Sequence, residues 1–231
     1  MKKKLLLVFL SLFFLTGCVK KQSMIDVPIA QDLDFESGFY VNENFIKTLE
    51  SLEEKKKGKD CSGLIYLINE KNDNIYFLEE EIYKFTPKSG RRSAGIYNFY
   101  KSNNNIIFKS PKIGDLIFFY NTTKNTKYSK IKQITHVGVV KDVFSDGRVS
   151  FLHNVRGVNR IDYINLNQKN SHKVNDKIVN SYITRCSKNK ISCLASNRFA
   201  GYGKVDHEKI CKMLYEMRKR EKIVKCLGVR Y

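Results

Sequence analysis

The sequence predicts one main domain of the α+β class, in which helices pack on antiparallel strands. Apolar residues recur at helical spacing over residues 42–54 and again over 206–225. Between these segments, residues 115–166 contain four runs rich in Val, Ile, Phe and Tyr, and Ser145-Asp146-Gly147 marks a hairpin turn between two of them. The chain has 231 residues, of which 42% are apolar, so it is long enough for one globular domain with a small extension.

The first eighteen residues predict export. Lys2, Lys3 and Lys4 precede an apolar run over residues 5–14, which at ten residues is too short for a transmembrane helix of about twenty. The run ends in Leu15-Thr16-Gly17-Cys18, which resembles the bacterial lipobox. That resemblance implies that residues 1–17 are removed as a lipoprotein signal peptide and that Cys18 is acylated. We therefore expect residues 18–41 to tether an exported domain to a membrane, inner or outer, facing the cell wall or periplasm.

The formal net charge of +19 suggests an anionic partner. Nucleic acid, anionic lipid and an anionic cell-wall polymer all have the required charge, and the export signal favours the last two. A lysine-rich genome composition would give the same surface without any partner. The net charge alone therefore does not identify a function.

Within the mature chain, the elements are predicted in order from capping residues and periodicity. Phe45, Leu49 and Leu52 share one face of the helix expected over 42–54. Asp60 is a suitable N-cap for a buried helix whose first residue is Cys61. Strands are expected over 115–120, 134–143, 148–153 and 158–166, with a further strand over 178–184 and a helix over 206–225.

Cys61 and His136 are the candidate nucleophile and base. A helix N-terminus and a nearby imidazolium lower the pKa of a thiol, so reactivity of Cys61 is expected below pH 8.5, although a cysteine here could also be a small core residue. If the chain turns at residues 145–147, His153 comes within about two positions of the residue opposite His136. His153 would then orient the His136 ring, with Asn154 as the alternative. His172 and His207 lie in polar surroundings and are expected to be solvated.

Four motifs in order resemble the NlpC/P-sixty family of cell-wall cysteine peptidases over about residues 58–166. They are Asp60-Cys61-Ser62-Gly63, the run from Pro111 to Phe119, His136-Val137-Gly138-Val139-Val140, and Phe151-Leu152-His153-Asn154 followed by Gly157-Val158. Arg91-Arg92-Ser93-Ala94 is also similar to a segment of that family.

The resemblance implies a papain-like fold with the nucleophile at the N-terminus of a buried helix that packs on an antiparallel sheet. It implies no metal or cofactor, peptidoglycan as partner, and cleavage of stem-peptide amide bonds, often next to D-glutamate. It assigns catalytic roles to Cys61, His136 and His153, and substrate contacts to Asp60 and Ser62. The family's aromatic segment before the nucleophile is missing, since Glu53 to Lys59 stands there, and Tyr40 is a candidate to supply a ring from further upstream.

Two other functions remain open. A CHAP-type amidase that cuts between muramic acid and L-alanine has the same order of Cys before His, whereas in lipid acyl-transferring relatives the His usually comes first. The other is a catalytically idle lipoprotein whose basic surface binds anionic wall polymer. The predicted organisation is a signal peptide (1–17), a tether (18–41), a catalytic domain (42–185) and a helical extension (186–231).

Four further cysteines, at positions 186, 193, 211 and 226, are expected to form disulfides in an exported domain. In one unbroken helix over 206–226, Cys211 and Cys226 would be about 22 Å apart, beyond the ~7 Å reach of a disulfide. Each would then pair with Cys186 or Cys193 and clamp the terminal helix. A helix that breaks near Arg220 would restore a Cys211–Cys226 pair.

Overall fold

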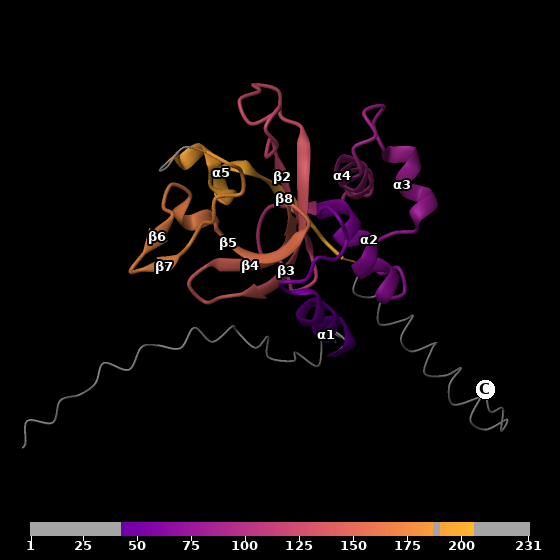
Figure 1. Ribbon diagram of the computed structural model, residues 1–231, viewed down its shortest axis with the longest axis horizontal. Helices are drawn as coiled ribbons and strands as arrows, with labels where there is room; N and C mark the ends of the chain where they lie inside the picture. Colours follow the sequence, from indigo (N-terminus) through magenta and orange to yellow (C-terminus); the bar gives the residue numbers. More distant parts are fainter. Residues whose placement is uncertain (1–42, 187–189, 206–231) are drawn as a thin grey trace, which may run out of the picture.

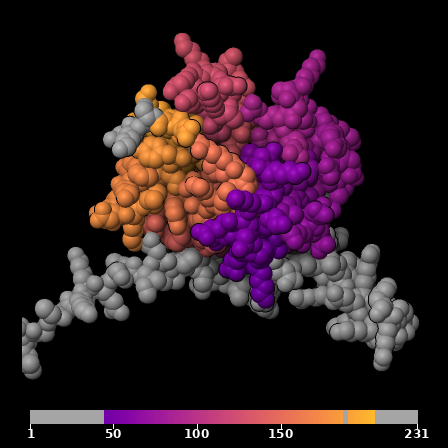
Figure 2. Space-filling model, in the orientation of Figure 1, coloured from indigo at the N-terminus to yellow at the C-terminus, as the bar shows by residue number. Residues whose placement is uncertain are grey.

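The computed structural model describes residues 43–186 and 190–205, which form a sheet between a helical half and an irregular segment (Figure 1). The loop between the second and third strands projects at the top of Figure 2, between the helices in purple and the segment in orange. The predicted signal peptide and tether with Cys18 and Tyr40, and the helix expected over 206–225 with His207, Cys211 and Cys226, lie outside the described residues.

The sheet has six strands, and every neighbouring pair is antiparallel. In spatial order the strands are β1 (Ile106–Ile107), β8 (Phe199–Gly203), β2 (Leu116–Tyr120), β3 (Ile134–Val143), β4 (Arg148–Val155) and β5 (Val158–Asn165). The four strands predicted between residues 115 and 166 and the turn between β3 and β4 are therefore confirmed. Helices and an antiparallel sheet together make this an α+β protein.

Helices lie against one face of the sheet. They are α1 (Glu43–Leu52), α2 (Cys61–Lys71), α3 (Glu79–Phe85) and α4 (Arg92–Ser102), of which α3 and α4 were not predicted. Leu64, Ile65 and Ile68 of α2 join a core that includes Phe118, Val137 and Val139. On the opposite face, Ile117, Phe119 and Val140 belong to a second core with Ala195 and Tyr202. The run in β2 is continuously apolar because both of its faces are buried.

The segment after β5 is mostly irregular. It contains a 3₁₀ turn, η1 (Leu166–Gln168), the small hairpin of β6 (Lys173–Val174) and β7 (Lys177–Ile178), a second 3₁₀ turn, η2 (Ile191–Cys193), and α5 (Ala195–Arg198). The strand predicted over 178–184 is wrong. There the buried Asn180 side chain donates to the carbonyls of Gln168 and Ser171 and accepts from the N–H of Asn165, so these backbone groups are satisfied without a strand ladder.

Residues beyond 185 belong to the same sheet. β8 pairs with β1 on one side and with β2 on the other. The expected boundary at residue 185 therefore falls within the folded domain, because a strand inside the sheet comes from the predicted extension. Among the described residues, no helix is long and apolar enough to cross a membrane.

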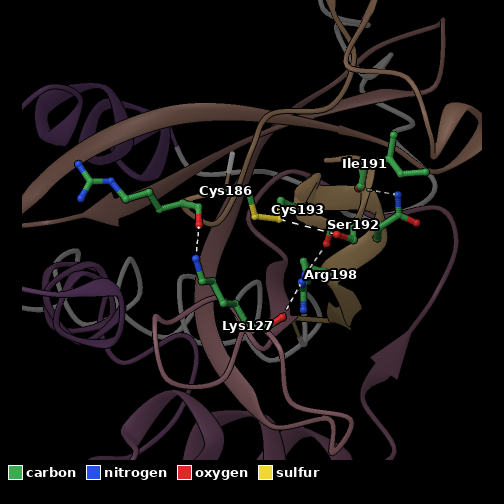
Figure 3. The surroundings of a disulfide bond; sticks show 8 residues. Lys127, Cys186, Ile191, Ser192, Cys193 and Arg198 are labelled. Carbon is green, nitrogen blue, oxygen red and sulfur yellow. Dashed lines mark hydrogen bonds between the residues drawn. A yellow bond between two sulfur atoms is a disulfide. The ribbon is translucent and has the colours of Figure 1, made fainter. Parts of the chain in front are cut away.

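A disulfide joins Cys186 to Cys193, with the Cα atoms 6.3 Å apart (Figure 3). This corrects the expectation that each of these cysteines pairs with Cys211 or Cys226. The chain reverses direction between the two cysteines. The N–H of Ile183 donates to the carbonyl of Cys193, and Tyr182 forms a bridge with Leu194, so the sulfur atoms meet locally.

Candidate active site

Cys61 is the first residue of α2, as predicted from its position after Asp60. The Asp60 carboxylate accepts from the N–H of Gly63 at 2.7 Å and caps the helix. The Lys55–Lys59 connector also folds closely over this end of α2. The carbonyl of Gly58 lies so near Gly63 that a Cβ on Gly63 would collide with it, which explains the glycine in the Cys61-Ser62-Gly63 sequence. The backbone N–H groups at this end of the helix are therefore fixed around the Cys61 sulfur.

Cys61 and His136 line the same cleft, whose volume is about 1280 Å³. The cleft is formed by the start of α2, the β2–β3 loop, the turn between β4 and β5, and residues between His172 and Cys186. Cys61 as a residue is partly exposed, but its sulfur is largely shielded from water, and the backbone N–H of Val137, the residue after His136, donates toward it. Within the described chain, no hydrogen bond joins the Cys61 thiol to the His136 ring. In unliganded enzymes, contacts between nucleophile and base are often longer than a hydrogen bond.

A chain of hydrogen bonds extends from His136 away from the cleft. His136 Nε2 lies 2.7 Å from His153 Nδ1, and His153 Nε2 lies 3.0 Å from Asp162 Oδ2. His153 faces Gly138 across the β3–β4 ladder, two positions from His136, so the predicted meeting of the two histidines is confirmed. Asp162 was missed. It lies on β5, diagonal to His153, and the expected pairing of β4 with β5 together with strand alternation could have identified it.

The Asp162 carboxylate decides where the protons of both rings lie. An ionised carboxylate only accepts hydrogen bonds, so opposite ionised Asp162 the Nε2 atom of His153 carries a proton. When that ring carries no second proton, its Nδ1 accepts from His136 Nε2. This leaves the proton of the neutral His136 ring on Nε2 and a lone pair on Nδ1. Burial, followed by the neighbouring His153, lowers the pKa of His136 well below 6.5. His136 is therefore a neutral base at pH 7.

The thiol itself is not ionised at neutral pH. Burial raises the pKa of Cys61 to about 11, the charge on Asp60 raises it further, and the N–H groups of Val137, Ser62 and Cys61 only partly oppose these effects. The expectation of a lowered thiol pKa is thus wrong, because loss of water around the sulfur outweighs the helix N-terminus. The resting site pairs a neutral thiol with a neutral imidazole.

The two residues expected to touch substrate have different surroundings. Asp60 lines the cleft and forms an ion pair with Arg92 at 3.3 Å. Burial disfavours the charge on Asp60, but the Gly63 N–H, the Ser62 hydroxyl and Arg92 together lower its pKa. Ser62 is buried and donates its hydroxyl to Asp60 at 2.8 Å, so the structure places it behind Asp60. The similarity of Arg91-Arg92-Ser93-Ala94 to a family segment singled out Arg92, but its pairing with Asp60, 32 positions away, was not predicted.

Asn154 does not take the place of His153. Its amide donates to the carbonyl of Lys57 and to the Asn159 side chain, while its oxygen accepts from the N–H of Gly157. All of these contacts hold the β4–β5 turn and the connector before α2. Asn154 therefore shapes the cleft, whereas the contact with His136 comes from His153.

An aromatic pair lines the cleft from the segment after β5. His172 stacks on Tyr182 with the ring centroids 4.7 Å apart, and His172 Nδ1 lies 2.7 Å from the carbonyl of Asn180. The expectation that His172 is solvated is therefore wrong, because the side chain is half-buried and held by these contacts. Tyr182 supplies an aromatic surface that the sequence before Cys61 lacks.

The described residues contain no group of three or more His, Cys, Asp and Glu side chains arranged to hold a metal ion. The cleft lining joins the Cys61 thiol and the His136 imidazole with one carboxylate and several cationic side chains. No protein-family model, no curated protein sequence and no solved structure matches this chain, so its function is inferred from the geometry of the cleft.

Proposed function

We propose that this protein is a papain-like cysteine hydrolase that cleaves amide bonds in the stem peptides of peptidoglycan. The observation that carries the proposal is the shared cleft of Cys61 and His136, with the His136 ring oriented by His153. The lipobox-like sequence at Cys18 supports a location of the reaction at a membrane surface that faces the cell wall. No metal or cofactor takes part in the proposed reaction.

The reaction starts from the neutral pair. As Cys61 Sγ attacks the amide carbonyl, its proton passes to Nδ1 of His136, and the N–H groups at the start of α2 stabilise the negative oxygen. The C–N bond then breaks, and the leaving amine takes the proton from His136. Water attacks the resulting thioester, with His136 accepting its proton, and this releases the carboxylic acid and restores the thiol.

Digestion of purified peptidoglycan tests the proposal. The wild-type protein should release soluble peptides, whereas Cys61→Ser and His136→Ala should each lose several orders of magnitude in rate, because members of a catalytic unit act together. Mass spectrometry of the products separates the possible bonds. New amino termini within the stem peptide indicate an endopeptidase, and intact stem peptides that begin with L-alanine indicate an amidase of the CHAP type.

One observation favours the second candidate, an idle lipoprotein that binds an anionic wall polymer. The thiol of Cys61 has a raised pKa and forms no hydrogen bond with His136 among the described residues. Under this alternative, wild-type protein binds intact wall material but releases nothing from it, and Cys61→Ser binds equally well. Release that depends on Cys61 excludes the idle alternative.

A further inference from the structure

The cleft beside Cys61 is lined by six cationic side chains. Three come from residues close to the start of α2 or in the β4–β5 hairpin, and three come from the β2–β3 loop and the disulfide segment. They are Lys59, Arg156, Arg160, Lys124, Lys127 and Arg185. Within the described residues, none of them forms an ion pair. The one carboxylate among the lining residues, Asp60, is already paired with Arg92.

The arginines show that positive charge is concentrated at the cleft, beyond what the general excess of lysine in this sequence would place there. The described ranges contain seven arginines, of which Arg92 and Arg148 bind carboxylates and Arg198 binds backbone carbonyls. Of the other four, three line the cleft, and only Arg91 lies outside it. Unpaired arginine is the side chain best suited to bind planar carboxylates through two parallel hydrogen bonds.

The cationic wall formed by the β2–β3 loop and the disulfide segment is held in place. Lys127 Nζ donates to the carbonyl of Arg185 at 3.0 Å, and Arg198 donates to the carbonyls of Lys127 and Ser192 (Figure 3). The disulfide of Cys186 fixes the residue next to Arg185. These contacts hold the Lys127 ammonium and the backbone that carries Arg185.

We infer that the cleft selects peptides that carry several free carboxylates over the same peptides in amidated form. This inference rests on the proposed function, since it concerns the substrate of the same site. Six unpaired cations and no unpaired carboxylate leave the empty cleft strongly positive, and carboxylates of the substrate complete the missing ion pairs. A carboxamide has the same shape but no charge, so it leaves the cations unpaired.

Binding is measured first, with full-length Cys61→Ser protein so that cleavage does not interfere. The probes are two synthetic stem peptides of one sequence, one with free side-chain and α-carboxylates and one with each replaced by a carboxamide. The acidic peptide should bind at least tenfold more tightly at low salt, and 0.5 M NaCl should remove most of this difference. Equal affinity for the two peptides overturns the inference.

Charge-neutral variants identify the residues. An exposed ion pair contributes little to binding, so each of Arg156→Gln, Arg160→Gln and Arg185→Gln should weaken binding of the acidic peptide by roughly 1.4-fold to fivefold. The triple variant keeps Lys59, Lys124 and Lys127, so it should lose most, but not all, of the preference for the acidic peptide. The matched controls are Arg91→Gln, an arginine outside the cleft, and Lys130→Gln, an exposed lysine of the β2–β3 loop that does not line it. If the controls weaken binding as much as the cleft variants, the inference is wrong.

Cleavage by the wild-type protein separates this inference from the proposed function. If neither peptide is cleaved but Cys61→Ser prefers the acidic one, the catalytic proposal fails and the inference on selectivity holds. If both peptides are cleaved with equal kcat/KM, the catalytic proposal holds and the inference fails. Binding of a polyphosphate chain without binding of either peptide also overturns the inference, because the cleft would then serve a phosphate polymer.

Discussion

Replacing Asp162 by alanine tests whether the hydrogen-bond chain behind His136 controls the base. Asp162 does not line the cleft, and among the described residues its side chain forms one hydrogen bond, with His153 Nε2 at 3.0 Å. Without this acceptor, His153 is free to carry its proton on Nδ1 and donate to His136 Nε2. The His136 proton then moves to Nδ1, so the ring can no longer accept the proton of the thiol.

The size of the effect follows from the strength of the lost hydrogen bond. A hydrogen bond to a charged group contributes about 1.5–3 kcal/mol. The side chain of Asp162 is 27% exposed, so water partly replaces it, and the lower end of this range applies. Losing about 1.5 kcal/mol of the preference for the reactive His136 tautomer corresponds to a roughly tenfold loss in kcat/KM for Asp162→Ala. Asp162→Asn should lose less, because its amide oxygen can still accept from His153.

Two measurements check this prediction. Peptide release from peptidoglycan gives the rate, and nitrogen NMR of the imidazole rings reports which nitrogen of His136 carries the proton. Asp142→Asn is the matched control, since Asp142 on β3 accepts one hydrogen bond, from Ser150, outside the chain of histidines. Asp162→Ala with wild-type rate and an unchanged His136 tautomer would refute the reasoning. A loss as large as that of His136→Ala would also contradict it.

Four other perturbations have defined outcomes. The pKa of His136 lies well below 6.5, so kcat/KM should stay constant as the pH falls from 7 to 6. It should decline only at a lower pH, where the ring becomes protonated. A decline of kcat/KM centred near pH 6.5 would argue against a buried neutral base. The rate at which iodoacetamide alkylates Cys61 should rise about tenfold for each pH unit between pH 8 and 10, because the pKa of the thiol is about 11. Peptide mass spectrometry measures this rate, and a rate that levels off near pH 9 would contradict the prediction. Gly63→Ala should lower the free energy of unfolding in urea by about 1–3 kcal/mol or more, since its Cβ meets the Gly58 carbonyl, and an unchanged midpoint would show that the connector moves freely. Cys18→Ala should release the protein from bacterial membranes into the soluble fraction, and unchanged membrane association would exclude the lipid anchor.

Local signals predicted the elements that carry the candidate catalytic residues. The strand over 134–143 was predicted with the observed ends, because alternation is clear there and a turn signal follows. The start of α2 was predicted from Asp60, whose side chain caps it in the structure. The turn signal at residues 145–147 also predicted that β3 pairs with β4. The contact between His136 and His153 could therefore be predicted from neighbouring sequence alone.

The elements that were missed depend on distant parts of the chain. α4 buries Ile96 and Tyr100 on one side but also contains Gly95, so its helical pattern is weak. β8 contains two glycines in five residues and is a strand only because β1 and β2 lie on either side of it. The ion pair of Asp60 with Arg92 and the cationic lining of the cleft likewise arise from residues that the fold, and not the local sequence, brings together.

The position of β8 also determines when the protein can fold during its synthesis. β8 ends at Gly203 and lies between β1 and β2, both of which are complete by Tyr120. The ribosome must therefore produce more than 80 further residues before the hydrogen bonds of β2 and β1 toward β8 can form. Until β8 has been made, the nascent chain cannot complete its sheet. The export signal predicted from residues 1–18 would therefore act on a chain that has not yet completed its fold.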